Sequence, residues 1–201
     1  GSAEENTYLA YIFGASHYLD NNYTYQMSVI TDEETGETTA TEIDEESISG
    51  AFYIPRSLRV VTINAPLAAI GEGAFYSAFG LEKVLFSEYE TEEGSGEYAY
   101  PVRSVGAHAF EYCHFLGYDS EIGTYVTNDW LGDVETFGEA AFKGYLAGNY
   151  YTSRLMYVGE LSAALTIADS AFEASYRISD LSFGDNLVSI GDRAFYANIF
   201  M

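Results

Sequence analysis

Apolar residues recur along this chain at spacings that repeat from one segment to the next. An Ala-Phe pair marks each segment, with its phenylalanine at Phe52, Phe75, Phe110, Phe142, Phe172 and Phe195. The first and last intervals between these phenylalanines are both 23 residues, whereas the three middle intervals are longer by 12, 9 and 7 residues. The pattern predicts a stack of 23-residue units in which the three middle units carry insertions.

A shared register surrounds each Ala-Phe pair. An apolar residue lies five positions before the phenylalanine, at Ile70, Val105, Phe137, Ile167 and Ile190, and glycine follows it in four of these five units. Six residues after the phenylalanine, three units continue as apolar-x-x-apolar-x-apolar, for example Leu81, Val84 and Phe86. The alternation of the last two marks predicts a short strand. The Gly-x-x-Ala-Phe segment predicts one helical or 3-10 turn whose phenylalanine fills the interior.

Together these registers predict a repeat solenoid, because one unit cannot bury its own apolar face and stacking supplies the core. We expect short parallel strands on one face, with short helical or 3-10 turns and loops on the other. Residues 1–7 are interpreted as a tag scar and disordered start, 8–50 as a degenerate N-terminal repeat with an acidic hairpin or loop, and 51–201 as about six repeats. The insertions fall near 87–100, 116–129 and 143–154, and we expect them to project as loops or hairpins from one rim.

The charge balance excludes two classes of partner. The chain has 31 Asp and Glu against 8 Lys and Arg, which gives a net charge of -23. Such a surface repels phosphate backbones and anionic membranes, so no nucleic acid and no direct membrane insertion are expected. No apolar run approaches the ~18 residues that a membrane span needs. The single cysteine, Cys113, allows no intrachain disulfide.

Candidate chemistry is sparse, and the sequence predicts no enzyme. No HExxH, Gly-x-Ser-x-Gly or phosphate-binding glycine loop is present, and no spacing selects one carboxylate pair. Cys113 and His114 are adjacent, so their side chains are expected to point apart rather than to form a nucleophile and its base. His108 occupies a variable position and is interpreted as a surface residue. No cofactor is predicted. The acidic stretches 31–46 and 87–97 leave calcium open, although neither has the alternating Asp/Asn-Gly loop of a recognised site.

Tyrosines gather in the irregular N-terminal segment and in the insertions. Tyrosine supplies large, rigid, amphipathic contact area, so these rings are candidates for ligand contact, with packing over the coil edges as the open alternative. The outward strand positions Val60, Thr62, Lys83, Leu85, Asp180 and Ser182 are expected to line the open face. The candidate ligand-binding residues are Tyr98, Tyr100, Tyr125, Trp130, Tyr150, Tyr151, Thr62, Lys83 and Asp180.

The units Ile70-Gly-Glu-Gly-Ala-Phe75 and Ile190-Gly-Asp-Arg-Ala-Phe195 resemble the BspA-like leucine-rich repeat, as does the unit that begins at Val105 and ends at Cys113. The resemblance covers about 47–201 well and 8–46 loosely, and Cys113 alone fills the family's cysteine position. It implies a bacterial surface or secreted protein, and some members are linked to adhesion to host matrix proteins. Two functions follow: a non-enzymatic extracellular binding module for a protein or glycan, or a purely structural spacer or stalk segment of a larger cell-surface protein.

Overall fold

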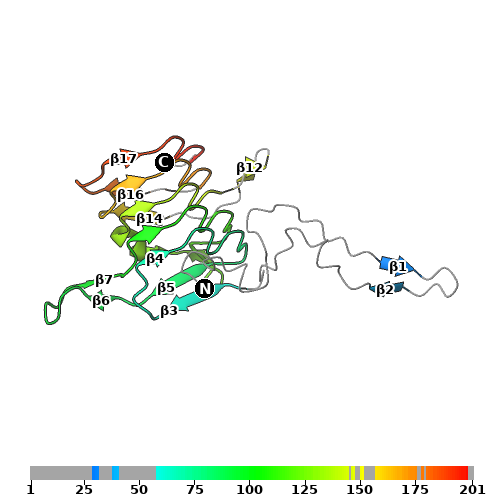
Figure 1. Ribbon diagram of the computed structural model, residues 1–201, viewed down its shortest axis with the longest axis horizontal. Coiled ribbons are helices and arrows are strands. Elements are labelled where there is room, and N and C mark those ends of the chain that lie inside the picture. The colour runs from blue at the N-terminus through cyan, green and yellow to red at the C-terminus, as the bar shows by residue number, and fades with distance from the viewer. Residues whose placement is uncertain are drawn as a thin grey trace.

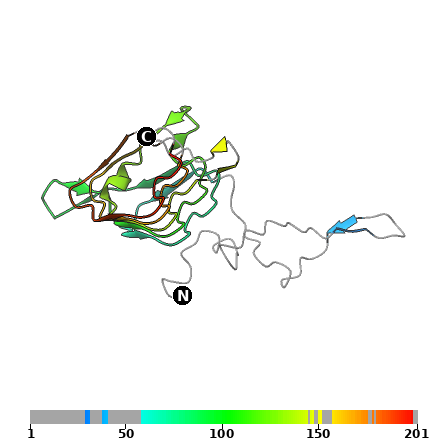
Figure 2. The ribbon, with the colours of Figure 1, turned by 90° about the horizontal axis from the view of Figure 1, so that it is seen from above.

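The computed structural model describes residues 29–31, 38–40, 58–144, 146–147, 150–151, 157–175, 178 and 180–198. Figure 1 shows the repeats from β3 to β17 following one another through a single stack, and Figure 2, seen from above, shows successive turns of the chain lying over one another. Separately, β1 (Val29–Thr31) pairs with β2 (Thr38–Ala40) in an antiparallel hairpin. In the described part of the chain, no helix has the length and apolar character needed to cross a membrane.

One parallel sheet runs through the whole described stack. Its five two-residue strands follow the order β17-β15-β11-β8-β4. They are β4 (Ala69–Ile70), β8 (Ser104–Val105), β11 (Thr136–Phe137), β15 (Thr166–Ile167) and β17 (Ser189–Ile190). The second residue of each strand is the apolar mark that lies five positions before the repeat phenylalanine, and all five marks are in register. The register found in the sequence is therefore the register of this sheet.

The longer strands form two separate parallel pairs on another face of the stack. They are β3 (Val60–Ile63) with β5 (Lys83–Phe86), and β14 (Tyr157–Leu161) with β16 (Asp180–Phe183). In the unit between them, the 3-10 helix η2 (Asp129–Asp133) takes the place of a strand and packs against β14. The sequence predicted strands on one face of the stack only. That prediction is wrong, because the connector between each long strand and its turn also pairs from coil to coil.

The Gly-x-x-Ala-Phe segments are successive turns, and the predicted helical character is absent from them in the described residues. In the first segment, the N–H of Phe75 donates to the carbonyl of Ala109 in the next coil at 2.7 Å, whereas the N–H of Tyr76 closes a turn onto Gly73 at 3.0 Å. A helix uses all of these N–H groups internally. Here every second N–H links two coils, and helix formation would remove those links.

This alternation requires a left-handed backbone at fixed positions. The residue two before each phenylalanine has a positive φ: Gly73 (57°), His108 (57°), Ala140 (52°), Ser170 (57°) and Arg193 (58°). L-residues with side chains pay about 1–2 kcal/mol for this conformation. The stack accepts that cost in four of these five coils, which shows how strongly the coil-to-coil hydrogen bonds constrain the backbone.

The repeat phenylalanines form one continuous stack of rings. Ring centroids are 5.0 Å apart between Phe75 and Phe110 and between Phe110 and Phe142, then 5.2 Å between Phe142 and Phe172 and between Phe172 and Phe195. Interplanar angles stay between 3° and 11° along this ladder. Stacked pairs at this separation contribute about 0.5–1.5 kcal/mol each beyond the burial of their surface. The predicted interior role of these rings is confirmed.

Two of the glycines that follow the apolar mark lie where the coils approach too closely for a side chain. A Cβ at Gly106 would lie 2.5 Å from the Glu72 nitrogen, and one at Gly138 would lie 2.4 Å from the Ala107 nitrogen. Neither glycine has a positive φ. These positions therefore require glycine for space rather than for backbone conformation.

The position that holds cysteine in the family carries a hydrogen-bond donor in three coils. The side chains of Cys113, Ser175 and Asn198 each donate to the carbonyl of the phenylalanine in the preceding coil, Phe75, Phe142 and Phe172 respectively, at 3.1, 2.9 and 3.1 Å. Serine and asparagine thus preserve the contact that the thiol makes. Although these two residues differ from the cysteine of the repeat pattern, they make the same hydrogen bond between coils.

Replacing Ala140 or its neighbour Ala141 by glycine separates backbone strain from packing. Both alanines are buried, and only Ala140 has a positive φ. Ala141→Gly loses a buried methyl and adds unfolded-chain entropy, so we expect it to destabilise by about 1 kcal/mol. Ala140→Gly loses a similar methyl but relieves left-handed strain of about 1–2 kcal/mol, so it should match or exceed the parent. Urea denaturation measures both, and equal losses would contradict the strain argument.

Ser175 tests the donor that recurs at this position of the coils. Ser175→Ala leaves the buried Phe142 carbonyl without this partner and is expected to lower the free energy of unfolding by about 1–2 kcal/mol. Ser175→Cys restores a donor of the kind found at Cys113, so it should recover part of that loss in the same denaturation experiment. A cysteine variant as unstable as the alanine variant would show that the hydrogen bond is immaterial.

Candidate functional site

The three segments expected as insertions each contain a two-stranded antiparallel hairpin. These pair β6 (Tyr89–Glu90) with β7 (Tyr98–Ala99), β9 (Tyr118–Asp119) with β10 (Thr124–Tyr125), and β12 (Leu146–Ala147) with β13 (Tyr150–Tyr151). The expectation of one common rim is wrong. The first hairpin follows β5, whereas the second precedes η2 and the third precedes β14, and Figure 1 shows β6–β7 and β12 on opposite sides of the stack.

Four outward side chains of β3 and β5 form what we call the β3–β5 face. Val60 pairs in register with Lys83, and Thr62 pairs with Leu85. Alternate residues of a strand point to opposite sides, so the intervening Val84 is buried in the core while these four face outward. Val60 and Leu85 are 43% and 46% exposed, and Thr62 is also exposed. Two aliphatic side chains are thus presented to solvent.

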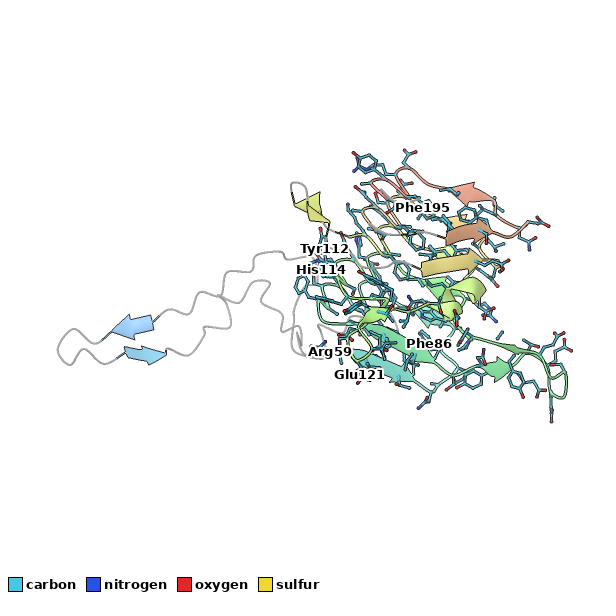
Figure 3. All side chains as sticks on the ribbon, turned by 180° about the vertical axis from the view of Figure 1, so that it is seen from behind. Arg59, Phe86, Tyr112, His114, Glu121 and Phe195 are labelled. Carbon is cyan, nitrogen blue, oxygen red and sulfur yellow. The ribbon has the colours of Figure 1, made fainter. Side chains whose placement is uncertain are left out.

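A hairpin borders each end of this face. The β6–β7 hairpin continues from the C-terminal end of β5, and the phenol of Tyr89 donates to the carbonyl of Asn64 just after β3 at 2.6 Å. The β9–β10 hairpin lies at the N-terminal ends of both strands, where the N–H of Gly117 donates to the carbonyl of Glu82 at 2.9 Å. Figure 3 shows Arg59 and Glu121 side by side at this end.

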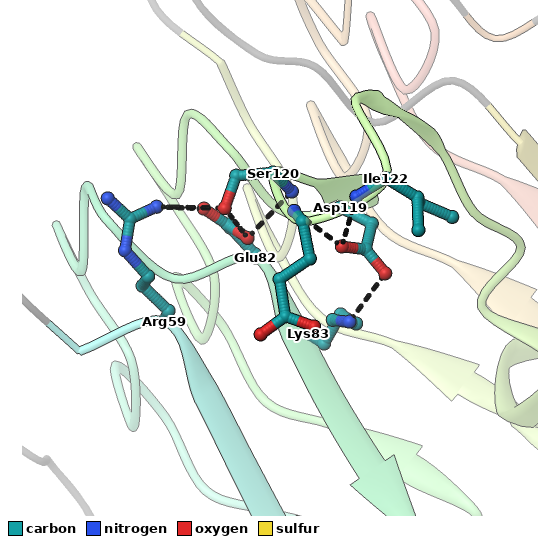
Figure 4. A network of polar contacts seen from close by, with 7 residues as sticks. Arg59, Glu82, Lys83, Asp119, Ser120 and Ile122 are labelled. Atoms are coloured by element: carbon teal, nitrogen blue, oxygen red, sulfur yellow. Dashed lines mark hydrogen bonds and ion pairs between the residues drawn. The ribbon is translucent and has the colours of Figure 1, made fainter.

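A buried carboxylate fixes the β9–β10 hairpin to the strands (Figure 4). Glu82 is 2% exposed, and its Oε2 accepts hydrogen bonds from the backbone N–H of Ser120 at 3.1 Å and from its hydroxyl at 2.9 Å. The other oxygen forms an ion pair with Arg59, which also donates to the Ser120 hydroxyl at 3.2 Å. Burial opposes ionisation of Glu82, but these hydrogen bonds outweigh it and lower its pKa.

Lys83 is held by the same hairpin. Its Nζ lies 2.6 Å from Oδ2 of Asp119, whose Oδ1 accepts the backbone N–H groups of Glu121 and Ile122 at 2.9 and 3.4 Å. The hydrogen bond from Lys83 lowers the pKa of Asp119, and the same contact raises the pKa of Lys83. Both groups therefore stay charged around neutral pH. The ammonium is engaged within the protein rather than offered to a ligand.

The tyrosine candidates differ in exposure. Tyr98, on β7, is 63% exposed. Tyr125, on β10, is partly buried, and its ring packs edge-on against Tyr118 at 5.3 Å. Tyr100 packs against the core, its N–H donates to Asp133 at 2.8 Å, and burial together with nearby carboxylates raises the pKa of its phenol. Of these rings, Tyr98 has the most surface to offer a ligand.

Trp130 was predicted as a ligand-binding residue, and the structure places it in the core instead. It is 3% exposed, and its ring lies 5.1 Å from Phe86 and 6.0 Å from Phe110. Together with Leu131, it is buried in η2 and fills the interior where the other units use strand residues. An indole in this position has almost no surface for an external ligand.

The remaining candidates lie in later coils. Tyr150 and Tyr151 form β13, and Asp180 begins β16 beside Tyr157, while the side chains of all three lie outside the described residues. The structure thus brings Thr62, Lys83 and the two hairpins with Tyr98 and Tyr125 around one face. It places the other candidates elsewhere in the stack.

Sequence reasoning missed the Glu82 and Asp119 contacts. Arg59 and Glu82 are 23 residues apart, which is the repeat length, so the repeat register was a usable signal for that pair. The contact between Lys83 and Asp119 spans 36 residues and depends on the hairpin, whose insertion breaks the register. Its residue types alone gave no signal.

Cys113 and His114 do not form a thiol site. The Cys113 thiol donates to the Phe75 carbonyl, and burial raises its pKa, which disfavours the thiolate that nucleophilic chemistry requires. The His114 ring packs edge-on against Phe79 at 5.0 Å. His108, expected at the surface, is partly buried and lies 2.6 Å from the Glu111 carboxylate. No catalytic arrangement results from these three residues.

Two further features bear on ligands. Across the described residues, no group of three or more His, Cys, Asp or Glu side chains is placed to hold a metal ion. Most of the acidic stretch 31–46, one of the two for which calcium was left open, lies outside the described residues. A shallow groove of about 390 Å³ on the five-stranded sheet is lined in part by Glu139, Asp169 and Ile190. It lies open to solvent, unlike the enclosed pocket in which an enzyme excludes water.

Comparison with known proteins gives one family. The model of the BspA type leucine rich repeat region matches residues 23–104 and 147–200 in six copies. No curated protein and no solved structure matches the chain. The unmatched middle, 105–146, contributes β11 to the continuous sheet and Phe110 and Phe142 to the ring ladder, so its coils have the same geometry despite their insertions.

The Glu82 carboxylate makes stability depend on pH. Because its folded pKa is lowered, ionised Glu82 contributes stability above the ordinary glutamate pKa, and that contribution is lost as the pH falls through the folded value. We expect the parent protein to lose more stability between neutral and acidic pH than Glu82→Gln, which cannot titrate there. Urea denaturation across this pH range compares the two. Parallel pH profiles would contradict the assignment.

Proposed function

The chain belongs to the BspA-type leucine-rich repeat family, and from this membership we propose that it is a non-enzymatic extracellular binding module. In this proposal the β3–β5 face, together with the tyrosine-bearing hairpins at its two ends, contacts a protein or glycan ligand. Repeat proteins of this kind commonly use such extended faces for binding. The family's link to bacterial surfaces supports a secreted or surface-attached location and a role in adhesion, with host matrix as a candidate partner.

One observation carries the proposal: Val60 and Leu85 are aliphatic and nearly half exposed at outward strand positions. At the position of Thr62 and Leu85, β14 and β16 carry Glu160 and Ser182 instead, and both are exposed and polar. Polar residues suffice there for a strand that only faces water. The exposed aliphatic pair therefore supports a contact function for the β3–β5 face.

The alternative is a structural spacer or stalk. A spacer needs only the inward residues that join the coils, and those are present throughout the described stack. It has no use for exposed aliphatic side chains, which carry a risk of aggregation unless a partner covers them. A binding module accounts both for the inward residues and for the exposed aliphatic side chains.

A screen against purified extracellular-matrix proteins and a glycan array, with and without calcium, tests the proposal. We expect at least one ligand to bind. Leu85→Ser and Tyr98→Ala should each weaken that binding about tenfold with the melting temperature nearly unchanged, and the double change of Tyr150 and Tyr151 to alanine should also weaken it.

Ser182→Ala is the matched control, because it changes an outward residue on the other strand pair and should leave binding intact. Uniformly negative screens would favour the spacer. A large loss of melting temperature in the tyrosine variants would show instead that these rings serve packing.

A further inference from the structure

The β3–β5 face has a chemistry that selects among partners. Val60 and Leu85 lie at diagonal corners of this face, because Val60 pairs with Lys83 and Leu85 pairs with Thr62. Val60 and Leu85 are aliphatic, whereas sugar rings are bound chiefly by flat aromatic side chains and directed polar groups. A flat aliphatic patch matches the apolar centre of a protein surface instead.

The surroundings of the face are acidic. Residues 58–64, 82–100 and 117–126 make up the face and its two bordering hairpins. Their charged side chains are Glu82, Glu88, Glu90, Glu92, Glu93, Glu97, Asp119 and Glu121, against Arg59 and Lys83. The exposed carboxylates of the two hairpins include Glu88, Glu97 and Glu121. The rim therefore carries a concentrated negative charge on a chain that is already at -23.

The two cations of this region are already engaged. Arg59 pairs with the buried Glu82, and Lys83 lies 2.6 Å from Asp119. Each is neutralised by a carboxylate of low exposure, so neither supplies a net positive site to an anionic ligand. The rim carboxylates are left to determine the sign of the local field.

We propose that the partner of the β3–β5 face is a protein surface with an aliphatic centre and a rim of lysine and arginine. This rests on the proposed binding function and narrows it to one class of partner. The aliphatic patch supplies the buried contact, and charge complementarity accelerates association and sets the orientation of the partner. Anionic polysaccharides and acidic proteins are repelled by the same rim.

A phage library that displays a folded helical scaffold with a randomised surface tests this on the full chain. Clones are selected for binding to the parent protein and against binding to Leu85→Asp. We expect the surviving clones to be enriched in Leu, Ile or Val flanked by Lys or Arg. They should bind Leu85→Asp at least about tenfold more weakly than the parent, a loss typical of a contact at the centre of an interface.

Charge and position are then checked separately on the purified clones. Glu121→Lys should slow association, and the association rate on the parent should fall as salt rises, because both act on the electrostatic attraction. Ser182→Asp, a comparable change on β16, should alter nothing. Surviving clones that are neutral or acidic, rates independent of salt, or the absence of any clone sensitive to Leu85→Asp would each overturn the proposal.

Failure here is distinct from failure of the proposed function. If a matrix protein or glycan binds through Leu85 but the selected clones lack basic residues, the chain is a binding module and its partner is not the cationic surface proposed here. If the clones are basic and aliphatic but the matrix and glycan screen gives no ligand, the surface chemistry holds and the adhesion role is rejected.

Discussion

The structure depends on one constraint, the distance between neighbouring coils at the Ala-Phe turns. At these turns, backbone hydrogen bonds such as those from Phe75 and Phe110 to the next coil are 2.7 Å long, and the phenylalanine rings above and below are 5.0–5.2 Å apart. That ring spacing is close to the distance between hydrogen-bonded strands, so the rings and the backbone set the same repeat. The glycines at 106 and 138 follow from it, because a Cβ at either position would lie within 2.5 Å of the backbone of the preceding coil.

The sequence predicted the features that this spacing imposes on every coil. Phe110, Val105 and Gly106 each have equivalents at a fixed offset in other units, and their burial and pairing agree with the predicted register. Local structure was predicted less well, because the backbone of the turn is set by contacts with the next coil. The positive φ of Ala140 cannot be read from an alanine, whose own preference is the opposite.

The candidate site was only partly predictable for a related reason. Outward positions such as Thr62 and Leu85 follow from strand alternation, and the structure places them outside as expected. Trp130 was misassigned although its spacing to Val134 and Phe137 equals that of Ile63 to Leu67 and Ile70, a register that marks an inward position. The attachment of the β9–β10 hairpin through Ser120 to Glu82 arises from an insertion, and insertions have no counterpart in the other units from which to infer a contact.

Hydrogen bonds give each coil a direction. At the turns the N–H groups of one coil donate toward the C-terminal end of the stack, as from Phe75 to Ala109 and from Phe110 to Ala141. A coil turned upside down would bring donor against donor along the turns. Units can thus be added to such a stack, lost from it or enlarged by a hairpin, but they cannot be inverted, and its two ends are never equivalent surfaces.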